Sequence, residues 1–242
     1  MKKNYRADLF ERYNETHGIN LDGDIDKKRI WFADYFNENY RPSIGTIEIS
    51  NVLDIGCNKG FLLSVIGDYY PTAELVGIDL DENDLNVAKN MNPTATFVHS
   101  ELSKFVTNCG DKFDLITCKA VLEHIPKDEI FTFLEDVKTL MKPGSILLLD
   151  VPNMAWLFAG HERYMDFTHE VGFTKESLMQ VLNASGFHSE IIPVDHVRYR
   201  SKKGRVYQQL CRRLMTFLLM GCDPEGASND IFCRSILAKV KL

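Results

Sequence analysis

One acidic residue and two glycines are spaced as a ligand-binding turn requires. Residues 52–55 are apolar except for Asp54, as expected for a short buried strand. Gly56 and Gly60 then frame a tight turn that leads into an apolar run suited to a helix. Such a corner directs backbone N–H groups and the electropositive start of a helix toward a ligand. The segment therefore predicts an anion- or cofactor-binding site.

The spacing of this turn narrows the choice of ligand. It contains neither the G-x-G-x-x-G of nicotinamide-binding turns nor the Gly-Lys-Ser/Thr of a P-loop. Asn58 stands where a middle glycine is common, and asparagine tolerates left-handed backbone angles better than most residues. The acid at the strand end disfavours a phosphate and favours a cationic or hydroxyl-rich ligand. An ordinary buried strand and turn is the alternative interpretation.

A second acid, Asp79, ends the next predicted strand, 25 residues after Asp54. A carboxylate at that position can accept hydrogen bonds from both hydroxyls of a ribose. The two motifs together resemble those of class I S-adenosylmethionine-dependent methyltransferases. The resemblance spans about residues 50–195, and it implies S-adenosyl-L-methionine as cofactor and S-adenosyl-L-homocysteine as product.

The same resemblance assigns further residues to the cofactor. Glu101 stands where the family usually has an aspartate that contacts the adenine amino group, between Ser100 and Leu102. The segment 113–126 resembles the family pattern after the fourth strand, which places Cys118 and Lys119 at the methionine end. The implied cofactor-binding residues are Asp54, Gly56, Cys57, Asn58, Gly60, Phe61, Asp79, Leu80, Ser100, Glu101, Leu102, Cys118 and Lys119.

Glu123 and His124 in that segment raise the question of a metal site. Neighbours in sequence rarely point together, and the chain has neither H-E-x-x-H nor an evident 2-His-1-carboxylate triad. We therefore expect a structural or cofactor-facing role for these two residues, and no metal.

A polar cluster past the fifth predicted strand is the candidate acceptor site. Residues 162–174 gather three acids, a histidine, a tyrosine and an arginine. The segment resembles the Arg-Tyr-x-Asp-x-Thr-His-Glu-x-x-Phe-Thr stretch of bacterial methyltransferases that act on surface polysaccharides, such as capsule or O-antigen, or on their precursors. His169 is the first candidate for general base, because imidazole titrates near neutral pH. Asp166 or Glu170 would orient His169 or replace it, and Arg163 and Tyr164 would shape the pocket; the predicted catalytic residues are His169, Asp166 and Tyr164.

Several alternatives stay open. His169 could serve only as a structural hydrogen-bonding group that closes the loop. The expected reaction is O-methylation of a surface glycan, a sugar precursor or a phosphoramidate-type capsule substituent, with N-methylation of an amino sugar or small amine as the alternative. A non-catalytic cofactor-binding partner subunit is a third hypothesis, and the glycine spacing disfavours a dehydrogenase.

The order of elements predicts an α/β fold with a Rossmann-like, seven-stranded, mostly parallel sheet and helices on both faces. Ligands of such sheets bind outside the carboxyl ends of the strands, where every motif above falls. The expected strands are 52–55, 75–80, 96–99, 113–118, 145–150, 190–194 and 231–242. The expected helices in this region are 60–70, 82–90, 127–140 and 175–185, with a turn at 142–144 and an irregular loop at 151–173.

We expect a single domain over residues 1–242. Residues 1–45 would form two helices around a polar break at 20–26, as aromatic core packing or as a lid that places Tyr13, His17 and Arg29 near the cofactor. Residues 46–195 would form the cofactor-binding core, and 196–242 a basic helix and the last strand.

Composition limits the remaining function classes. A net charge of −6 gives no general case for nucleic-acid binding, and the run 214–222 is too short to span a bilayer. The six cysteines form no C-x-x-C pair, which favours a reducing, cytoplasmic location. Segment 198–213 carries seven basic residues, so a solvated helix, an anionic acceptor, a membrane surface and a second subunit in a homodimer are all open.

Overall fold

The computed structural model describes residues 9–10, 25–194, 202–222 and 229–242. Of the first helix expected before residue 45, only residues 9–10 lie within these ranges, and they are helical; Tyr13 and His17 lie outside them. The basic residues Arg198 and Arg200 also lie outside them.

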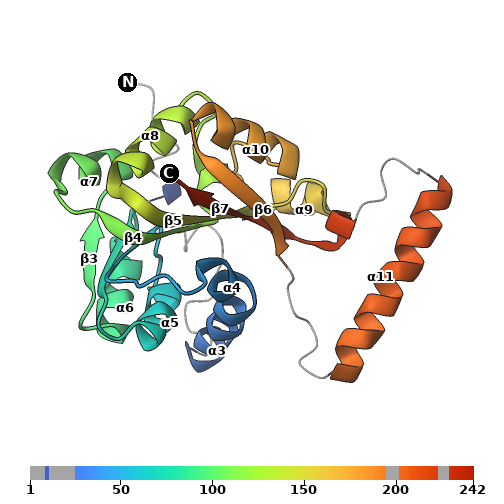
Figure 1. The fold of residues 1–242 in the computed structure, drawn as a ribbon, viewed down its shortest axis with the longest axis horizontal. Coiled ribbons are helices and arrows are strands. Elements are labelled where there is room, and N and C mark those ends of the chain that lie inside the picture. Colours follow the sequence, from blue (N-terminus) through green and yellow to red (C-terminus); the bar gives the residue numbers. More distant parts are fainter. Residues whose placement is uncertain (1–8, 11–24, 195–201, 223–228) are drawn as a thin grey trace.

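A seven-stranded mixed sheet forms the centre of the molecule, in the order β3-β2-β1-β4-β5-β7-β6 (Figure 1). Strands β1 to β5 pair in parallel, and β7 runs antiparallel to both of its neighbours, β5 and β6. The predicted mostly parallel, seven-stranded Rossmann-like sheet is therefore confirmed. The strands are β1 (Asn51–Ile55), β2 (Glu74–Asp79), β3 (Thr96–His99), β4 (Phe113–Lys119), β5 (Met141–Pro152), β6 (His188–Val194) and β7 (Ser235–Lys241).

Helices cover both faces of this sheet (Figure 1). One face carries α3 (Ile25–Tyr35), the π-helix η1 (Phe36–Tyr40), α4 (Arg41–Ile44), α5 (Phe61–Tyr69) and α6 (Glu82–Met91). The other carries α7 (Leu102–Asn108), α8 (Ile130–Leu140) and α10 (Lys175–Ala184), with α9 (Ala159–Tyr164) near the end of β5.

The alternation of side chains along the strands divides the core into two apolar clusters. On β5, Leu147 and Leu149 pack with α8 and α10, whereas Ile146 and Leu148 pack with α3 and α5. All four are fully buried. Each helical layer thus covers its own set of alternate strand residues. On β1 and β4, Val52 and Leu115 face the α3–α5 layer, as do the even positions of β1 and the odd positions of β4 from Leu115 onward.

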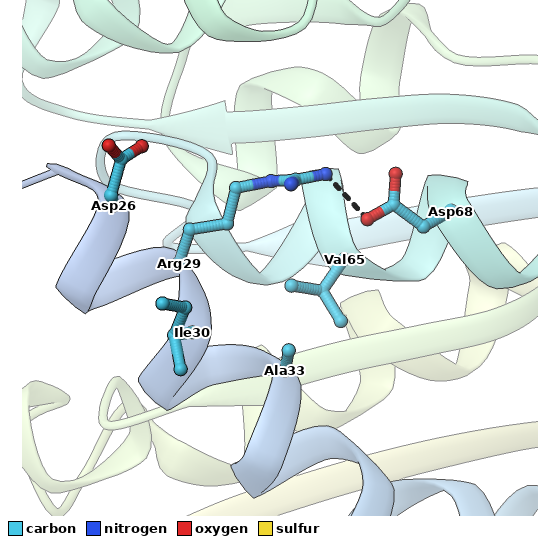
Figure 2. A pocket seen from close by; sticks show the side chains of 6 residues that line it. All are labelled: Asp26, Arg29, Ile30, Ala33, Val65 and Asp68. Carbon is cyan, nitrogen blue, oxygen red and sulfur yellow. Dashed lines mark hydrogen bonds and ion pairs between the residues drawn. The ribbon is translucent and has the colours of Figure 1, made fainter.

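Helix α3 is held on α5 by an ion pair (Figure 2). The guanidinium of Arg29 lies 2.5 Å from the Asp68 carboxylate and donates to Ser64 Oγ at 3.3 Å. These contacts border a hollow lined by Asp26, Arg29, Ile30, Ala33, Val65 and Asp68. Arg29, which the lid hypothesis placed near the cofactor, therefore anchors α3 to the outer side of α5.

Some elements differ from the sequence prediction. Strand β5 begins at Met141, because residues 142–144, predicted as a turn before it, form a bulge that Ser145 closes by accepting from the Lys142 N–H. The last strand begins only at Ser235, after a 3₁₀ turn (η3, Asn229–Phe232). The short helices α7 and α9 fall in segments for which no helix was predicted.

Helix α11 (Lys202–Cys222) lies outside the two layers (Figure 1). It has no acidic residue, and its exposed side chains include Arg213, Leu214, Phe217 and Leu218. Arg205 pairs with Glu38 of η1 at 3.0 Å. Among the described residues, no helix is both long enough and apolar enough to cross a membrane.

Candidate functional site

The carboxyl ends of β1, β2 and β4 meet at one edge of the sheet, where Asp54 lies. Its register partners are Gly77 on β2 and Thr117 on β4. Asp54 is buried, and its Oδ1 accepts a hydrogen bond of 2.6 Å from the Thr117 hydroxyl. Burial raises the pKa of Asp54 to about 7, although the Thr117 hydrogen bond acts in the opposite direction. The edge thus contains a carboxylate that a positively charged ligand would stabilise.

The glycine turn after β1 is tied to the end of β2. The N–H groups of Gly56 and Cys57 both donate to the Ile78 carbonyl, at 2.9 and 3.0 Å. Gly56, Asn58 and Gly60 all have positive φ, and the value of 48° at Asn58 confirms the left-handed conformation that its position suggested. The Asn58 side chain also bonds to Asp84 on α6. The chain thus forms a rigid, sharply turned corner.

Gly56 is required sterically as well as conformationally. A Cβ there would lie 2.3 Å from Val121 Cγ2, and its φ is +71°. We expect Gly56→Ala to lower the free energy of unfolding by about 1–3 kcal/mol, through steric overlap and backbone strain. Urea denaturation would measure this loss. Gly110→Ala is the matched control, because a Cβ at Gly110 meets nothing within 4 Å; equal losses for the two variants would contradict the steric argument.

Asp79 lies beside this turn, at the end of β2. Its Oδ2 accepts from the Asn58 N–H at 2.7 Å, and its Oδ1 from the Asp81 N–H at 2.9 Å. Burial raises its pKa, whereas these backbone hydrogen bonds lower it. Each oxygen keeps a further lone pair for a ligand hydroxyl. The next residue, Leu80, keeps 37% of its surface exposed and offers an apolar rim.

The residues expected near the adenine lie after β3. The Ser100 N–H donates to the Asp79 carbonyl at 3.2 Å, so this loop is tied to the end of β2. Glu101 is exposed, pairs with Lys104 at 3.4 Å and precedes the first residue of α7. Leu102 is buried beneath it. The Glu101 carboxylate is thus accessible to a ligand at this edge.

Lys119 belongs to a buried polar network that the sequence analysis did not find. Its Nζ lies 3.4 Å from Asp150 Oδ2, in the directly paired position on β5, and 4.8 Å from the ring centre of Tyr35. Tyr35 and Tyr40, from the N-terminal layer, both donate their hydroxyls to Asp150 Oδ2. Burial, reinforced by the Asp150 charge, raises the pKa of both tyrosines, so they remain donors.

Cys118, which precedes Lys119 on β4, faces the opposite side of the sheet. It is buried, which raises the pKa of its thiol.

A second polar network joins the turn after β4 to the loop after α9. The Thr168 hydroxyl donates to Asp166 Oδ1 at 2.6 Å and lies 2.9 Å from His124 Nδ1. Because the hydroxyl proton is directed to Asp166, Nδ1 of His124 carries the ring proton and donates to the Thr168 oxygen. The hydrogen bonds thus assign the tautomer of His124.

His169 packs against His124, with ring centres 4.7 Å apart. Its Nδ1 lies 2.8 Å from the Glu162 carbonyl, which only accepts, so Nδ1 carries a proton, and in the neutral form of the ring Nε2 has the lone pair. Nε2 lies 4.0 Å from Asp166 Oδ2. The structure therefore brings His169 and Asp166 together as expected. Tyr164, the third predicted catalytic residue, does not join them: it is 81% exposed and lies against Arg163. Arg163 in turn donates to the backbone carbonyls of His169 and Glu170.

Glu123 completes this group. It lies in the 3₁₀ turn Leu122–His124, is 2% exposed, and neither of its carboxylate oxygens has a hydrogen-bond partner among the described residues. Burial raises its pKa to about 8. One donor atom each from Glu123, His124 and His169 lie within 4.8 Å of one another. The expectation that Glu123 and His124 would diverge does not match this geometry, because the tight turn directs both toward His169.

The residues at the sheet edge fit an adenosyl sulfonium better than a phosphate. The edge presents carboxylates at Asp54 and Asp79 and an accessible one at Glu101, together with the apolar rim at Leu80. A Cβ at Gly77 would lie 2.8 Å from Cys57 Sγ, so this glycine permits the close packing of β2 against the turn. Carboxylates suit an amino group, a sulfonium and ribose hydroxyls, whereas they would repel a phosphate.

Comparisons with known proteins identify the family. A family model described as a methyltransferase domain matches residues 6–190. The ubiquinone biosynthesis O-methyltransferase of Colwellia psychrerythraea is 26% identical over 191 residues, which cover 67% of this chain and 74% of that protein. The protein of the same name from Coxiella burnetii is 27% identical over 173 residues, covering 59% and 69%.

Solved structures share the fold. A methyltransferase dependent on S-adenosylmethionine from Archaeoglobus fulgidus superposes with a TM-score of 0.63 at 19% identity, covering 99% of this chain and all of that one. The plantazolicin methyltransferase BpumL, solved in complex with S-adenosylhomocysteine, gives 0.64 at 18% identity, covering 98% and 93%. The glycine turn, the carboxylates at the edge of the sheet and the matching family model lead to one conclusion: the chain belongs to the methyltransferase domain family and is an S-adenosylmethionine-dependent methyltransferase.

Proposed function

We propose that this enzyme methylates a hydroxyl group of a small or glycan acceptor, which it activates at the cluster of Glu123, His124 and His169. The observation that carries this proposal is the assigned tautomer of His169. Because Nδ1–H is held by the Glu162 carbonyl, Nε2 presents a lone pair to the cluster. A hydroxyl must lose its proton during methyl transfer, and a neutral imidazole in a partly buried site is suited to accept it.

The cofactor would lie along the edge formed by β1, β2 and β4. Asp79 would accept the ribose hydroxyls, Glu101 would face the adenine, and Asp54 and Lys119 would lie near the methionine end. When bound, S-adenosylmethionine supplies a methyl group already activated by its sulfonium. The chain itself holds the acceptor oxygen in line and excludes water. Glu123 follows Lys119 by four residues, in the turn directly after β4, which supports a position of the cluster near this end of the site.

Replacement of His169 tests the assignment. We expect His169→Ala to lower kcat by about 10²- to 10⁴-fold, since a general base contributes that much, while the Kd for S-adenosylmethionine stays within about twofold. Radiolabelled methyl transfer and calorimetry would measure the two quantities. His188→Ala, on the exposed start of β6, is the control. Turnover of His169→Ala at the wild-type rate would remove His169 from the mechanism.

The nature of the acceptor is the finer part of the proposal. The loop 162–174 resembles that of enzymes acting on surface polysaccharides, and the relatives described above are named as O-methyltransferases of ubiquinone biosynthesis. Both support a hydroxyl acceptor. Methyl transfer to sugar nucleotides, capsule fragments and phenols, followed by mass spectrometry, would identify it. Transfer only to amines would favour the N-methyltransferase alternative, in which a base is less important.

A further inference from the structure

We propose that Glu123, His124 and His169 bind a divalent first-row metal ion that holds the oxygen of the methyl acceptor. Two imidazoles and one carboxylate suit ions such as Zn²⁺, Mn²⁺, Fe²⁺ and Co²⁺. The binding claim stands on the geometry of the cluster alone, whereas the catalytic role of the ion rests on the proposed function.

The positions of the three donors support this site. Their ligand atoms already lie within 4.8 Å of one another. Donors bound about 2.1 Å from a common ion are separated by about 3.0–4.2 Å, so small side-chain movements would complete the geometry. The three side chains come from the turn after β4 and the loop after α9, and these segments are joined by hydrogen bonds from the N–H groups of Glu170 and Val171 to the Glu123 carbonyl.

The state of Glu123 is the independent observation. A carboxylate that is 2% exposed and has no hydrogen-bond partner in the described part of the chain is costly, because buried charges are normally paired. A cation between Glu123 and the two rings would compensate that cost. The carboxylate thus points to a ligand that the protein itself does not supply.

The two histidines are oriented as metal ligands usually are. Metal-binding histidines donate their second ring N–H to a carbonyl or to a hydrogen-bonded acceptor, which fixes the tautomer. His169 donates Nδ1–H to the Glu162 carbonyl, and His124 donates Nδ1–H to Thr168, which in turn donates to Asp166. Both rings therefore carry the lone pair on Nε2, the atom that would bind the ion.

Three protein ligands leave coordination positions open for the acceptor. A hydroxyl bound there would release its proton more easily, because the ion withdraws electron density from oxygen. The proton passes to solvent, the oxygen forms a bond to the methyl carbon, and the carbon–sulfur bond breaks with its electron pair remaining on sulfur. In this scheme Nε2 of His169 holds the ion, and the ion replaces the histidine as the group that activates the hydroxyl.

Metal binding by the chain of residues 1–242 tests the site without any acceptor. After treatment with a chelator, Co²⁺ should bind with one ion per chain and give the visible absorption of a nitrogen- and oxygen-ligated ion, and Zn²⁺ should displace it. We expect Glu123→Gln and His169→Ala to weaken Co²⁺ binding by at least about tenfold. Glu123→Gln is neutral and isosteric, so circular dichroism should show an unchanged fold.

Glu135→Gln is the matched control, because it makes the same substitution at an exposed carboxylate on α8, outside the proposed site. Its Co²⁺ affinity should equal that of the wild type. Absence of Co²⁺ and Zn²⁺ binding, or binding unchanged in Glu123→Gln and His169→Ala, would overturn the proposal. If no metal binds but His169→Ala still loses turnover, the metal site is rejected and the proposed function stands. If a metal binds but no hydroxyl is methylated, the proposed function is rejected and the metal site stands.

Discussion

Asp54→Asn should increase the stability of the unliganded protein at pH 8 and, in the same variant, abolish measurable binding of S-adenosylmethionine. The reason lies in the position of the carboxylate, which is 2% exposed at the end of β1. Desolvation raises its pKa to about 7, so at pH 8 the folded protein bears a poorly compensated buried charge. Asparagine keeps the oxygen that accepts from Thr117 but carries no charge. The amino group or sulfonium of the cofactor would lose its counter-charge.

The sign of the pH dependence follows from this shift. The folded-state pKa of about 7 exceeds the unfolded value of 3.8, so the folded state binds the proton more tightly. Compared with that of Asp54→Asn, the free energy of unfolding of the wild type is highest below about pH 4 and falls as the pH rises to about 7. Above about pH 7 it stays lower than at pH 4, by up to a few kcal/mol. Cofactor affinity should change in the opposite direction, since ionised Asp54 attracts the cation and binding should tighten from pH 6 to 8.

Thermal denaturation with and without S-adenosylmethionine separates the two effects. Without ligand at pH 8, Asp54→Asn should melt a few degrees above the wild type. With saturating ligand the order should reverse, because only the wild type gains stability from binding. Asp111→Asn, at an exposed position, should behave as the wild type in both conditions. A variant with unchanged cofactor affinity would show that Asp54 does not contact the cofactor, and the assignment of this edge would then fail.

The geometry that the sequence predicted at this edge of the sheet is local in the chain. Asp54, Asn58 and Gly60 belong to one continuous strand–turn–helix segment, so their spacing reveals the positive φ of the turn directly. Asp79 follows from the same logic, because parallel strands of a βαβ unit end at the same edge of the sheet. Elements with strong apolar patterns, such as β4 and α8, were likewise predictable.

The missed parts depend on contacts between distant segments. Tyr35 and Tyr40 reach Asp150 across 115 and 110 residues, and no local pattern distinguishes them from aromatic residues that only pack in a core. In the sequence, Asp150 is not distinguished from any other acidic residue at the end of a strand. Similarly, the approach of His169 to His124 depends on the conformation of the loop after β5. A hint existed in the side-chain alternation, since Asp54, Thr117, Lys119 and Asp150 all occupy positions that face the α3–α5 layer.

Asp150→Ala should cause the largest loss of stability at this edge, about 3–5 kcal/mol. Asp150 is 1% exposed, and it accepts hydrogen bonds from two buried tyrosine hydroxyls and pairs with Lys119. Its removal leaves an ammonium group and two hydroxyls without their acceptor. Each unsatisfied buried donor costs about 1–3 kcal/mol. Urea denaturation would measure the loss, and Asp128→Ala, at an exposed position on the turn before α8, should cost less than about 0.5 kcal/mol.

A double-mutant cycle would show whether the network holds the N-terminal layer on the sheet. Tyr40→Phe alone should cost about 1 kcal/mol, because it removes one hydrogen bond and leaves Asp150 with its other partners. Combined with Asp150→Ala it should cost almost nothing more, since the hydroxyl has already lost its acceptor. Hydrogen exchange of residues 25–44 should accelerate in Asp150→Ala more than exchange of α8. Strictly additive losses, with equal exchange in both segments, would mean that Asp150 stabilises the sheet without joining α3 and η1 to it. If the losses are instead coupled, the layer that carries Tyr35 and Tyr40 is fastened at the end of β5, beside Lys119 and the proposed methionine end of the cofactor.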